Sequence, residues 1–169
     1  KLELNQWPQP PQKEVRYLLT DSRQLTTNPD ETLFFALKTS HNDGALFIND
    51  LYKKGVRMFV LHHDSLEECL MKQDAVYLLV DNALDALQAL AAYKRSLFHG
   101  QVIGITGSNG KTVVKEWLYE LLKQDYRVIR SPKSYNSQIG VPLSVWQLAS
   151  LNNSASEHSD KHAMHPNKK

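Results

Sequence analysis

A glycine-rich turn followed by a lysine and a threonine is the part of this sequence best suited to chemistry. It reads GSNGKT and follows an apolar run. Gly107 and Gly110 permit backbone conformations that other residues avoid, so successive N–H groups can turn inward around an anion. The Lys111 ammonium can reach the β- and γ-phosphates of a nucleotide, and the Thr112 hydroxyl can ligate Mg²⁺. The predicted nucleotide-binding residues are Gly107, Ser108, Asn109, Gly110, Lys111 and Thr112.

The turn differs from the common P-loop pattern G-x-x-x-x-G-K-[ST], because Ile105 stands where that pattern has its first glycine. The preceding residues 101–106, QVIGIT, form the kind of apolar run that gives a strand buried on both faces. Residues 113–122 carry their apolar side chains on one helical face, and such a helix directs its positive dipole end at the turn. The other interpretation is a glycine-rich turn with a surface lysine. The flanking strand and helix favour a phosphate site built on a shorter P-loop.

Strand-like and helix-like stretches alternate along the chain. Strands are predicted at residues 14–20, 32–38, 56–61, 75–80, 101–106 and 126–130. Helices are predicted at residues 45–54, 65–72, 81–98, 113–122 and 141–148. Gly55 is expected to end the first of these helices, and Asp81 or Asn82 to cap the third. The alternation predicts an α/β fold with a largely parallel sheet.

The position of the glycine-rich unit predicts two domains. A strand, glycine-rich turn and helix usually open a nucleotide fold, so we expect a boundary near residue 99. Residues 1–98 are then a small N-terminal α/β domain, and residues 99–148 are the first part of a P-loop parallel-sheet ATPase domain. Residues 149–169 are polar and aperiodic, so we expect a disordered tail. Since a P-loop domain needs further strands, residues 100–148 are expected to be only marginally stable alone.

Composition and charge exclude several classes of protein. A chain of 169 residues with 41% hydrophobic residues can bury a core, and a net charge of +2 is too weak to indicate nucleic acid or an anionic membrane as partner. One cysteine, Cys69, allows no internal disulfide and indicates a reducing compartment. No apolar run reaches the length of a membrane span, and the N-terminus lacks the layout of a signal peptide. We therefore expect a cytoplasmic protein with no nucleic-acid or membrane partner.

Three motifs in order resemble the Mur ligase family. GITGSNGKT is similar to that family's P-loop, T-G-[ST]-x-G-K-[ST]. LLTDSR followed by LFFALKTSHNDGALFI resembles the N-terminal domain of members that act on UDP-linked muramoyl peptides, with D-[ST]-R and then F-x-A-L-x-G-x-x-x-D-G-H-x-F. SPKSYNSQIGVPLSVW resembles the asparagine-containing loop that follows the second strand. The similarity covers about residues 15–148. The chain departs from the family at two positions beside the expected UDP-sugar site: Thr39 stands where the family has glycine, and Ala45 where it has histidine.

This resemblance implies an ATP-dependent amide ligase of peptidoglycan synthesis, with ATP and Mg²⁺ as cofactors. The chain most resembles members that add D-alanyl-D-alanine to UDP-N-acetylmuramoyl-tripeptide through an acyl phosphate, in the form fused ahead of an alanine racemase. The resemblance implies that residues 1–98 bind the UDP-muramoyl peptide, with Ser22 and Arg23 on its diphosphate. It implies catalytic roles for Lys111 and Asn136, and Thr112 as the metal ligand. Asp43 and Gly44 are interpreted as a turn and helix entry.

Other functions remain open at this point. One is another ATP enzyme: a different Mur-type ligase, a folate-type polyglutamate ligase or an unrelated P-loop kinase. The D-S-R and F-F-A-L segments argue against the last two. The other is a non-catalytic nucleotide-binding fragment. The family's later glutamate, histidine and modified lysine, and its C-terminal domain, have no counterpart here, so this chain alone is expected to be incomplete for catalysis.

Overall fold

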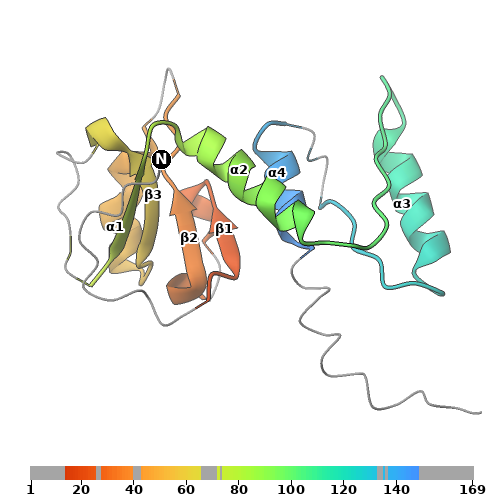
Figure 1. The fold of residues 1–169 in the computed structure, drawn as a ribbon, viewed down its shortest axis with the longest axis horizontal. Coiled ribbons are helices and arrows are strands. Elements are labelled where there is room, and N and C mark those ends of the chain that lie inside the picture. Colours follow the sequence, from red (N-terminus) through yellow and green to blue (C-terminus); the bar gives the residue numbers. More distant parts are fainter. Residues whose placement is uncertain are drawn as a thin grey trace, which may run out of the picture. The chain divides into compact units, whose positions relative to one another are not determined.

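The structure is a computed structural model that describes residues 14–25, 28–39, 43–65, 72, 74–132, 135 and 137–148. Contacts within the chain divide it into two compact units, Lys1–Ala89 and Leu90–Lys169, and each is described by itself (Figure 1). Three sequence predictions fall outside the described residues: Asn136, most of the helix at 65–72 and the tail 149–169. No helix in the described part of the chain is long and apolar enough to cross a membrane.

The first unit is built on a four-stranded sheet. Its strands are β1 (Tyr17–Leu19), β2 (Thr32–Phe35), β3 (Met58–His62) and β4 (Val76–Val80). They lie in the order β1-β2-β3-β4, and every neighbouring pair is parallel, with Phe34 opposite Phe59 and Phe59 opposite Tyr77. The first four predicted strands and the parallel sheet are therefore confirmed.

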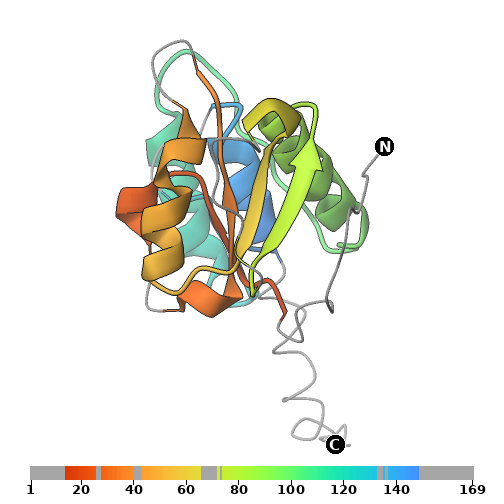
Figure 2. The same ribbon diagram turned by 90° about the vertical axis from the view of Figure 1, so that its left-hand side faces the viewer.

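Both faces of the two central strands are buried. All four residues of β2 and the first four of β3 are buried, as expected for strands that read as continuous apolar runs. Figure 2 shows α1 (Ile48–Lys53) on one side of the sheet and the first turns of α2 (Ala83–Ser96) on the other. Side chains of α1 pack in one core with Phe34 and Phe59. The two phenyl rings lie edge to face, with 6.4 Å between their centroids.

Local signals set the ends of these helices. Gly55 has φ of 102°, its N–H donates to Tyr52 O, and the next N–H, of Val56, donates to Leu51 O. This is the Schellman arrangement, and Leu51 and Val56 are both fully buried beneath it. Asn82 caps α2, because its Oδ1 accepts from the backbone N–H groups of Leu84 and Asp85.

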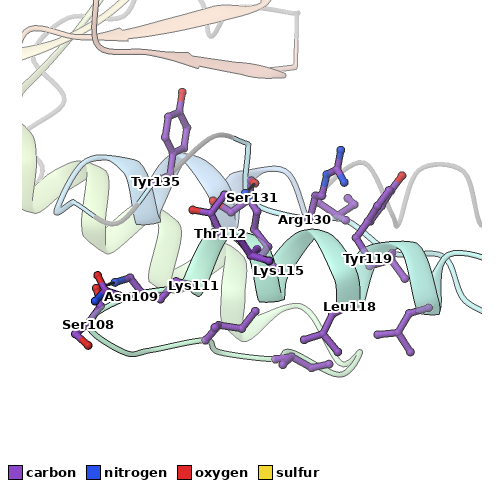
Figure 3. A pocket seen from close by; sticks show the side chains of 17 residues that line it. Ser108, Asn109, Lys111, Thr112, Lys115, Leu118, Tyr119, Arg130, Ser131 and Tyr135 are labelled. Carbon is purple, nitrogen blue, oxygen red and sulfur yellow. Dashed lines mark hydrogen bonds between the residues drawn. The ribbon is translucent and has the colours of Figure 1, made fainter.

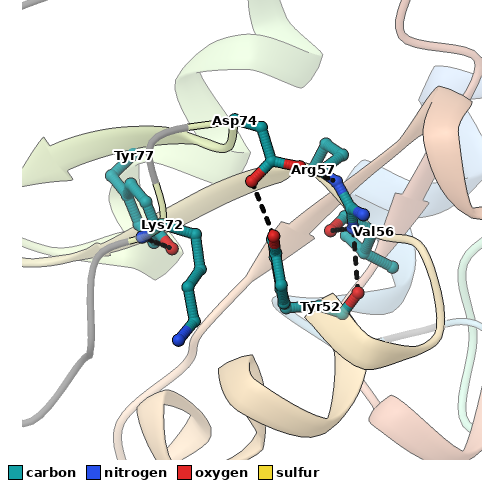
Figure 4. A network of polar contacts seen from close by, with 6 residues as sticks. All are labelled: Tyr52, Val56, Arg57, Lys72, Asp74 and Tyr77. Carbon is teal, nitrogen blue, oxygen red and sulfur yellow. Dashed lines mark hydrogen bonds and ion pairs between the residues drawn. The ribbon is translucent and has the colours of Figure 1, made fainter.

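A polar cluster joins the end of α1 to the starts of β3 and β4 (Figure 4). Arg57 donates from Nε to Asp74 Oδ2 at 3.0 Å and from a guanidinium nitrogen to Tyr52 O at 2.8 Å. The Tyr52 hydroxyl donates to Asp74 Oδ1 at 2.6 Å, and the Arg57 guanidinium lies 4.2 Å from the centre of the Tyr52 ring. The Tyr52 hydrogen bond lowers the pKa of Asp74 below its usual value. The cluster therefore fixes α1 at the edge opposite the strands' carboxyl ends.

The second unit contains α3 (Lys111–Leu122) and α4 (Gly140–Trp146). The prediction of strands at residues 101–106 and 126–130 is wrong, because neither segment forms a strand. A strand needs neighbours to satisfy its N–H and C=O groups, and within the described residues of this unit no strand lies beside either segment. Val102 and Ile103 are accordingly 52% and 60% exposed.

Candidate functional site

The glycine-rich turn has the backbone geometry that its sequence predicts. Gly107 has φ of 145° and Gly110 has φ of 78°, both in the region that side-chain-bearing residues rarely adopt. Gly110 is the left-handed residue immediately before α3, and Lys111 is the first residue of that helix. No neighbouring atom lies within 4 Å of the position that a Cβ would take at Gly110. Glycine is therefore required there by conformation, and not by crowding.

Lys111 lies folded back across the turn. Its Nζ donates to Gly107 O at 2.5 Å and to Ser108 O at 3.4 Å. The ammonium is therefore close to the N-terminus of α3, where the helix dipole also concentrates positive charge. Both features favour an anion at this point of the chain.

A pocket of about 520 Å³ lies against this turn and α3, within the range usual for small-molecule sites. Five of the six predicted nucleotide-binding residues line it, from Ser108 to Thr112, while Gly107 does not. Figure 3 shows Ser108, Asn109 and Lys111 gathered at the turn, with Lys115 further along α3 near Ser131. The rest of the wall includes seven aliphatic residues: Ile103, Ile105, Val113, Leu118, Leu122, Val128 and Ile129. It also includes Lys115, Tyr119, Arg130, Ser131 and Tyr135. The pocket thus combines a cationic, amide-rich end with an apolar end.

The D-S-R motif forms a capped turn at the carboxyl end of β1. Ser22 and Arg23 lie in the 3₁₀ turn η1 (Ser22–Gln24), and Asp21 caps it by accepting from Arg23 N at 3.1 Å. Asp21 also accepts from Arg23 Nε at 2.9 Å and from Nη2 at 2.8 Å. The hydrogen bonds from Arg23 lower the pKa of Asp21 to about 2. The Arg23 side chain is 87% exposed, so its guanidinium remains accessible.

Comparison with known proteins connects these two features. A sequence model described as "Mur ligase family, catalytic domain" matches residues 14–95, and one described as "Mur ligase middle domain" matches residues 105–167. The chain belongs to the Mur ligase family. The first match contains the D-S-R turn, and the second contains the glycine-rich turn and α3.

Two relatives of this Mur ligase chain carry the same name. UDP-N-acetylmuramoyl-tripeptide--D-alanyl-D-alanine ligase of Borreliella burgdorferi is 35% identical over 139 residues, covering 79% of this chain and 30% of that protein. The protein of the same name from Bacillus subtilis is 37% identical over 139 residues, covering 82% and 29%. This chain therefore spans about 30% of the length of these relatives.

Solved structures of MurF are also similar to this chain. The crystal structure of MurF from Acinetobacter baumannii matches with a TM-score of 0.68 and 29% identity, over 82% of this chain and 29% of that one. MurF ligase from Thermotoga maritima, solved in complex with ADP, matches with a TM-score of 0.61 and 32% identity, over 78% and 29%. The α/β architecture of this Mur ligase chain is thus shared with MurF structures.

Sequence reasoning missed a set of contacts beside the glycine-rich turn of this Mur ligase chain. Lys115, one helical turn after Lys111, donates from Nζ to Ser131 O at 2.8 Å, and its side chain is only 15% exposed. The Ser131 and Ser144 hydroxyls lie 2.8 Å apart, and Ser144 Oγ donates to Gly140 O at 3.0 Å. These bonds link α3 to α4 through Ser131. The i, i+4 spacing of the two lysines was the available signal, because it places both on one face of α3.

Asp43 and Gly44 have the structural role that the sequence indicates. Asp43 caps the 3₁₀ turn η3 (Gly44–Phe47) by accepting from Ala45 N at 2.9 Å, and it pairs with Lys38 at 3.3 Å. Gly44 lies so close to Ala36 that an added Cβ would be 2.7 Å from its Cα. In this Mur ligase chain the D-G pair therefore packs a turn against the end of β2.

Proposed function

We propose that this chain supplies the UDP-muramoyl-peptide-binding and phosphate-binding parts of an ATP-dependent ligase. That ligase joins D-alanyl-D-alanine to UDP-N-acetylmuramoyl-tripeptide. The observation that carries the proposal is the left-handed Gly110 that places Lys111 at the start of α3 and at one end of a 520 Å³ pocket. The names of the similar ligases support the joining reaction. The ADP bound to the Thermotoga maritima protein supports ATP as the nucleotide.

The phosphates of ATP bind at the cationic end of this pocket. Backbone N–H groups of the turn donate to phosphate oxygens, and the α3 dipole favours their negative charge. Lys111 exchanges its present carbonyl acceptors, Gly107 O and Ser108 O, for phosphate oxygens. A phosphate oxygen carries negative charge that a carbonyl oxygen lacks, so the Coulomb attraction between the ammonium and the phosphate favours the exchange.

The residues fit a Mg²⁺ ion that arrives with the nucleotide. Thr112 follows Lys111 in the first turn of α3 and lines the pocket, so its hydroxyl would hold the ion beside the phosphates. In the described part of the chain no three His, Cys, Asp or Glu residues gather as a metal cage. This suits Mg²⁺, which usually binds through few protein oxygens together with phosphates and water. The ion would neutralise phosphate charge during transfer.

The reaction needs positioning more than covalent catalysis by the protein. A carboxylate oxygen of the tripeptide attacks the γ-phosphorus, which forms an acyl phosphate and releases ADP. The amine of D-alanyl-D-alanine then attacks the acyl carbon, so that the amide forms, phosphate leaves and the amine loses a proton. Lys111 and the turn hold the γ-phosphoryl group in place for the first step. Asn136 takes a catalytic role, as the family resemblance implies, and Ser22 and Arg23 hold the UDP group.

Binding experiments on residues 1–169 test the proposal. Fluorescently labelled ADP should bind saturably, and Lys111→Ala should weaken it by about tenfold or more, since a hydrogen bond to a charged group contributes roughly 1.5–3 kcal/mol. Lys123→Ala is the matched control, because it removes the same charge at the far end of α3, outside the pocket. Equal affinity in the wild type and Lys111→Ala would contradict the phosphate site.

A second titration tests the substrate half of the proposal. UDP-N-acetylmuramoyl-tripeptide should bind the wild-type chain, and Ser22→Ala should weaken that binding. If the labelled ADP binds but the UDP-linked peptide does not, the chain is a nucleotide-binding protein of another substrate class. The fusion to an alanine racemase stays a prediction, which the mass of the native gene product would test.

A further inference from the structure

We propose that Asp21 is a positioning residue that holds the Arg23 guanidinium in one orientation for the diphosphate of the UDP-linked substrate. This inference rests on the proposed function, which uses Ser22 and Arg23 at that diphosphate. One Asp21 carboxylate makes all three relevant contacts: to Arg23 N at 3.1 Å, to Nε at 2.9 Å and to Nη2 at 2.8 Å. The same group thus fixes the turn and the side chain that the turn carries.

The remaining donors of Arg23 suit a diphosphate. A guanidinium has five N–H donors in a fixed plane, and the paired contact with Asp21 uses two of them. Three donors remain, on a side chain that is 87% exposed, whereas the Asp21 side chain is 29% exposed. Because the fork is rigid, fixing its inner edge on a carboxylate also fixes the direction of its outer donors.

The position of the turn supports a ligand there. Asp21 and Arg23 follow β1 at the carboxyl end of an all-parallel sheet. Ligands of open α/β sheets bind outside this edge. The low pKa of Asp21, about 2, keeps its carboxylate ionised at any working pH, so the paired contact persists in the free protein. Gln24 adds a further donor to the same carboxylate, at 3.3 Å from Oδ2.

Asp21 has two opposite effects on the affinity for a diphosphate. The direction in which affinity changes when Asp21 is replaced shows which effect is larger. Its charge repels the nearer phosphate, and for one unit of negative charge at about 7 Å in water this reduces affinity on the order of threefold. Its hydrogen bonds to Arg23 order that side chain before the ligand binds, which raises the affinity by up to roughly 30-fold. If positioning dominates, Asp21→Asn weakens binding by about tenfold. If only repulsion acts, the same change strengthens binding. Asparagine caps a helical turn as well as aspartate does, so the turn is retained.

The experiment is a calorimetric titration of the chain with UDP, with uridine as the diphosphate-free control. Four proteins are compared: wild type, Asp21→Asn, Arg23→Ala and the double variant. Asp50→Asn is the matched control, since it removes the same charge from an exposed position on α1 of the same unit. Thermal unfolding checks that each variant is folded.

We expect Asp21→Asn to weaken UDP binding by about tenfold when Arg23 is present, and not to weaken it in the Arg23→Ala background. Uridine affinity should be equal in all variants, and Asp50→Asn should match the wild type. Equal or tighter UDP binding by folded Asp21→Asn, with Arg23→Ala still weakened, would overturn the role of Asp21 and leave the proposed function intact. A wild-type chain that binds neither UDP nor the UDP-linked peptide would overturn both.

Discussion

Replacing Gly44 with alanine should destabilise the first unit far more than the size of one methyl group suggests. A Cβ at this position lies 2.7 Å from Ala36 Cα, 2.7 Å from Leu37 N and 2.8 Å from Ala36 C. All three are backbone atoms at the end of β2, so no side chain can rotate away. Gly44 N also donates to Leu37 O at 2.9 Å, which resists separation of the two segments. The strand end or the turn must therefore move.

The expected cost follows from this overlap. Ordinary contacts of a Cβ begin at about 3.4 Å, so the backbone must separate by roughly 0.7 Å, and overpacking of this kind costs about 1–3 kcal/mol or more. We take about 3 kcal/mol, because a backbone hydrogen bond is strained as well. For a unit of this size each kcal/mol lowers the melting temperature by about 4–8 °C, so the expected fall is about 12–24 °C.

Differential scanning calorimetry measures this change, and hydrogen exchange of the Phe34 and Phe59 amides assigns it to the sheet. Leu46→Ala is the matched control, because Leu46 lies two residues along the same 3₁₀ turn and is 66% exposed. That variant should stay within about 0.5 kcal/mol of the wild type. If Gly44→Ala melts with the control, the turn does not pack on β2 as described, and the reasoning is wrong.

Three further predictions concern other parts of the molecule. Lys115→Met keeps the apolar stem but removes the bond to Ser131 O, which contacts α4 through Ser144, so amide protection at Leu143 in α4 should fall by up to about 1.5 kcal/mol in hydrogen exchange, and unchanged protection would contradict the link. Leu87→Ala removes a fully buried side chain of α2 and should cost about 2–5 kcal/mol in calorimetry; a smaller loss would show that the site is loosely packed. The pKa of Asp21 is lowered to about 2 from 3.8, so its contribution to stability is present above pH 4 and is lost as pH falls toward 2. Asp21→Asn should therefore not show this loss of stability between pH 4 and pH 2. The loss is less than about 1 kcal/mol because the Asp21–Arg23 pair lies at the surface. If the stability of the variant falls with pH as that of the wild type does, this contribution of Asp21 is excluded.

Much of the first unit could be predicted because its signals are local. The apolar runs predict β1 to β4, and TLFF is buried at every position, as a central parallel strand should be. Gly55 predicts the end of α1, where its positive φ supports two hydrogen bonds. The choice between Asp81 and Asn82 as the cap of α2 could not be made from composition, and the structure assigns it to Asn82.

The second unit shows what an apolar pattern cannot predict. Residues 101–106 and 126–130 have the composition of strands, but composition describes a preference for burial and not the presence of a hydrogen-bonding neighbour. The conformation of the glycine-rich turn does not depend on such a neighbour. Its two positive-φ glycines and the helix that begins at Lys111 are local features, so they match the prediction although the flanking segments do not.

Ala45 shows how a departure from a family pattern can change meaning once the fold is known. The family resemblance places a histidine at this position, beside the expected UDP-sugar site. Here Ala45 is only 5% exposed and belongs to the same core cluster as Ile48 and Phe34. Its N–H is held by the Asp43 cap, and the preceding Gly44 lies against backbone, so a larger side chain has little freedom to point elsewhere. The alanine therefore contributes to packing of the turn, and the diphosphate contacts that we propose for Ser22 and Arg23 do not involve it.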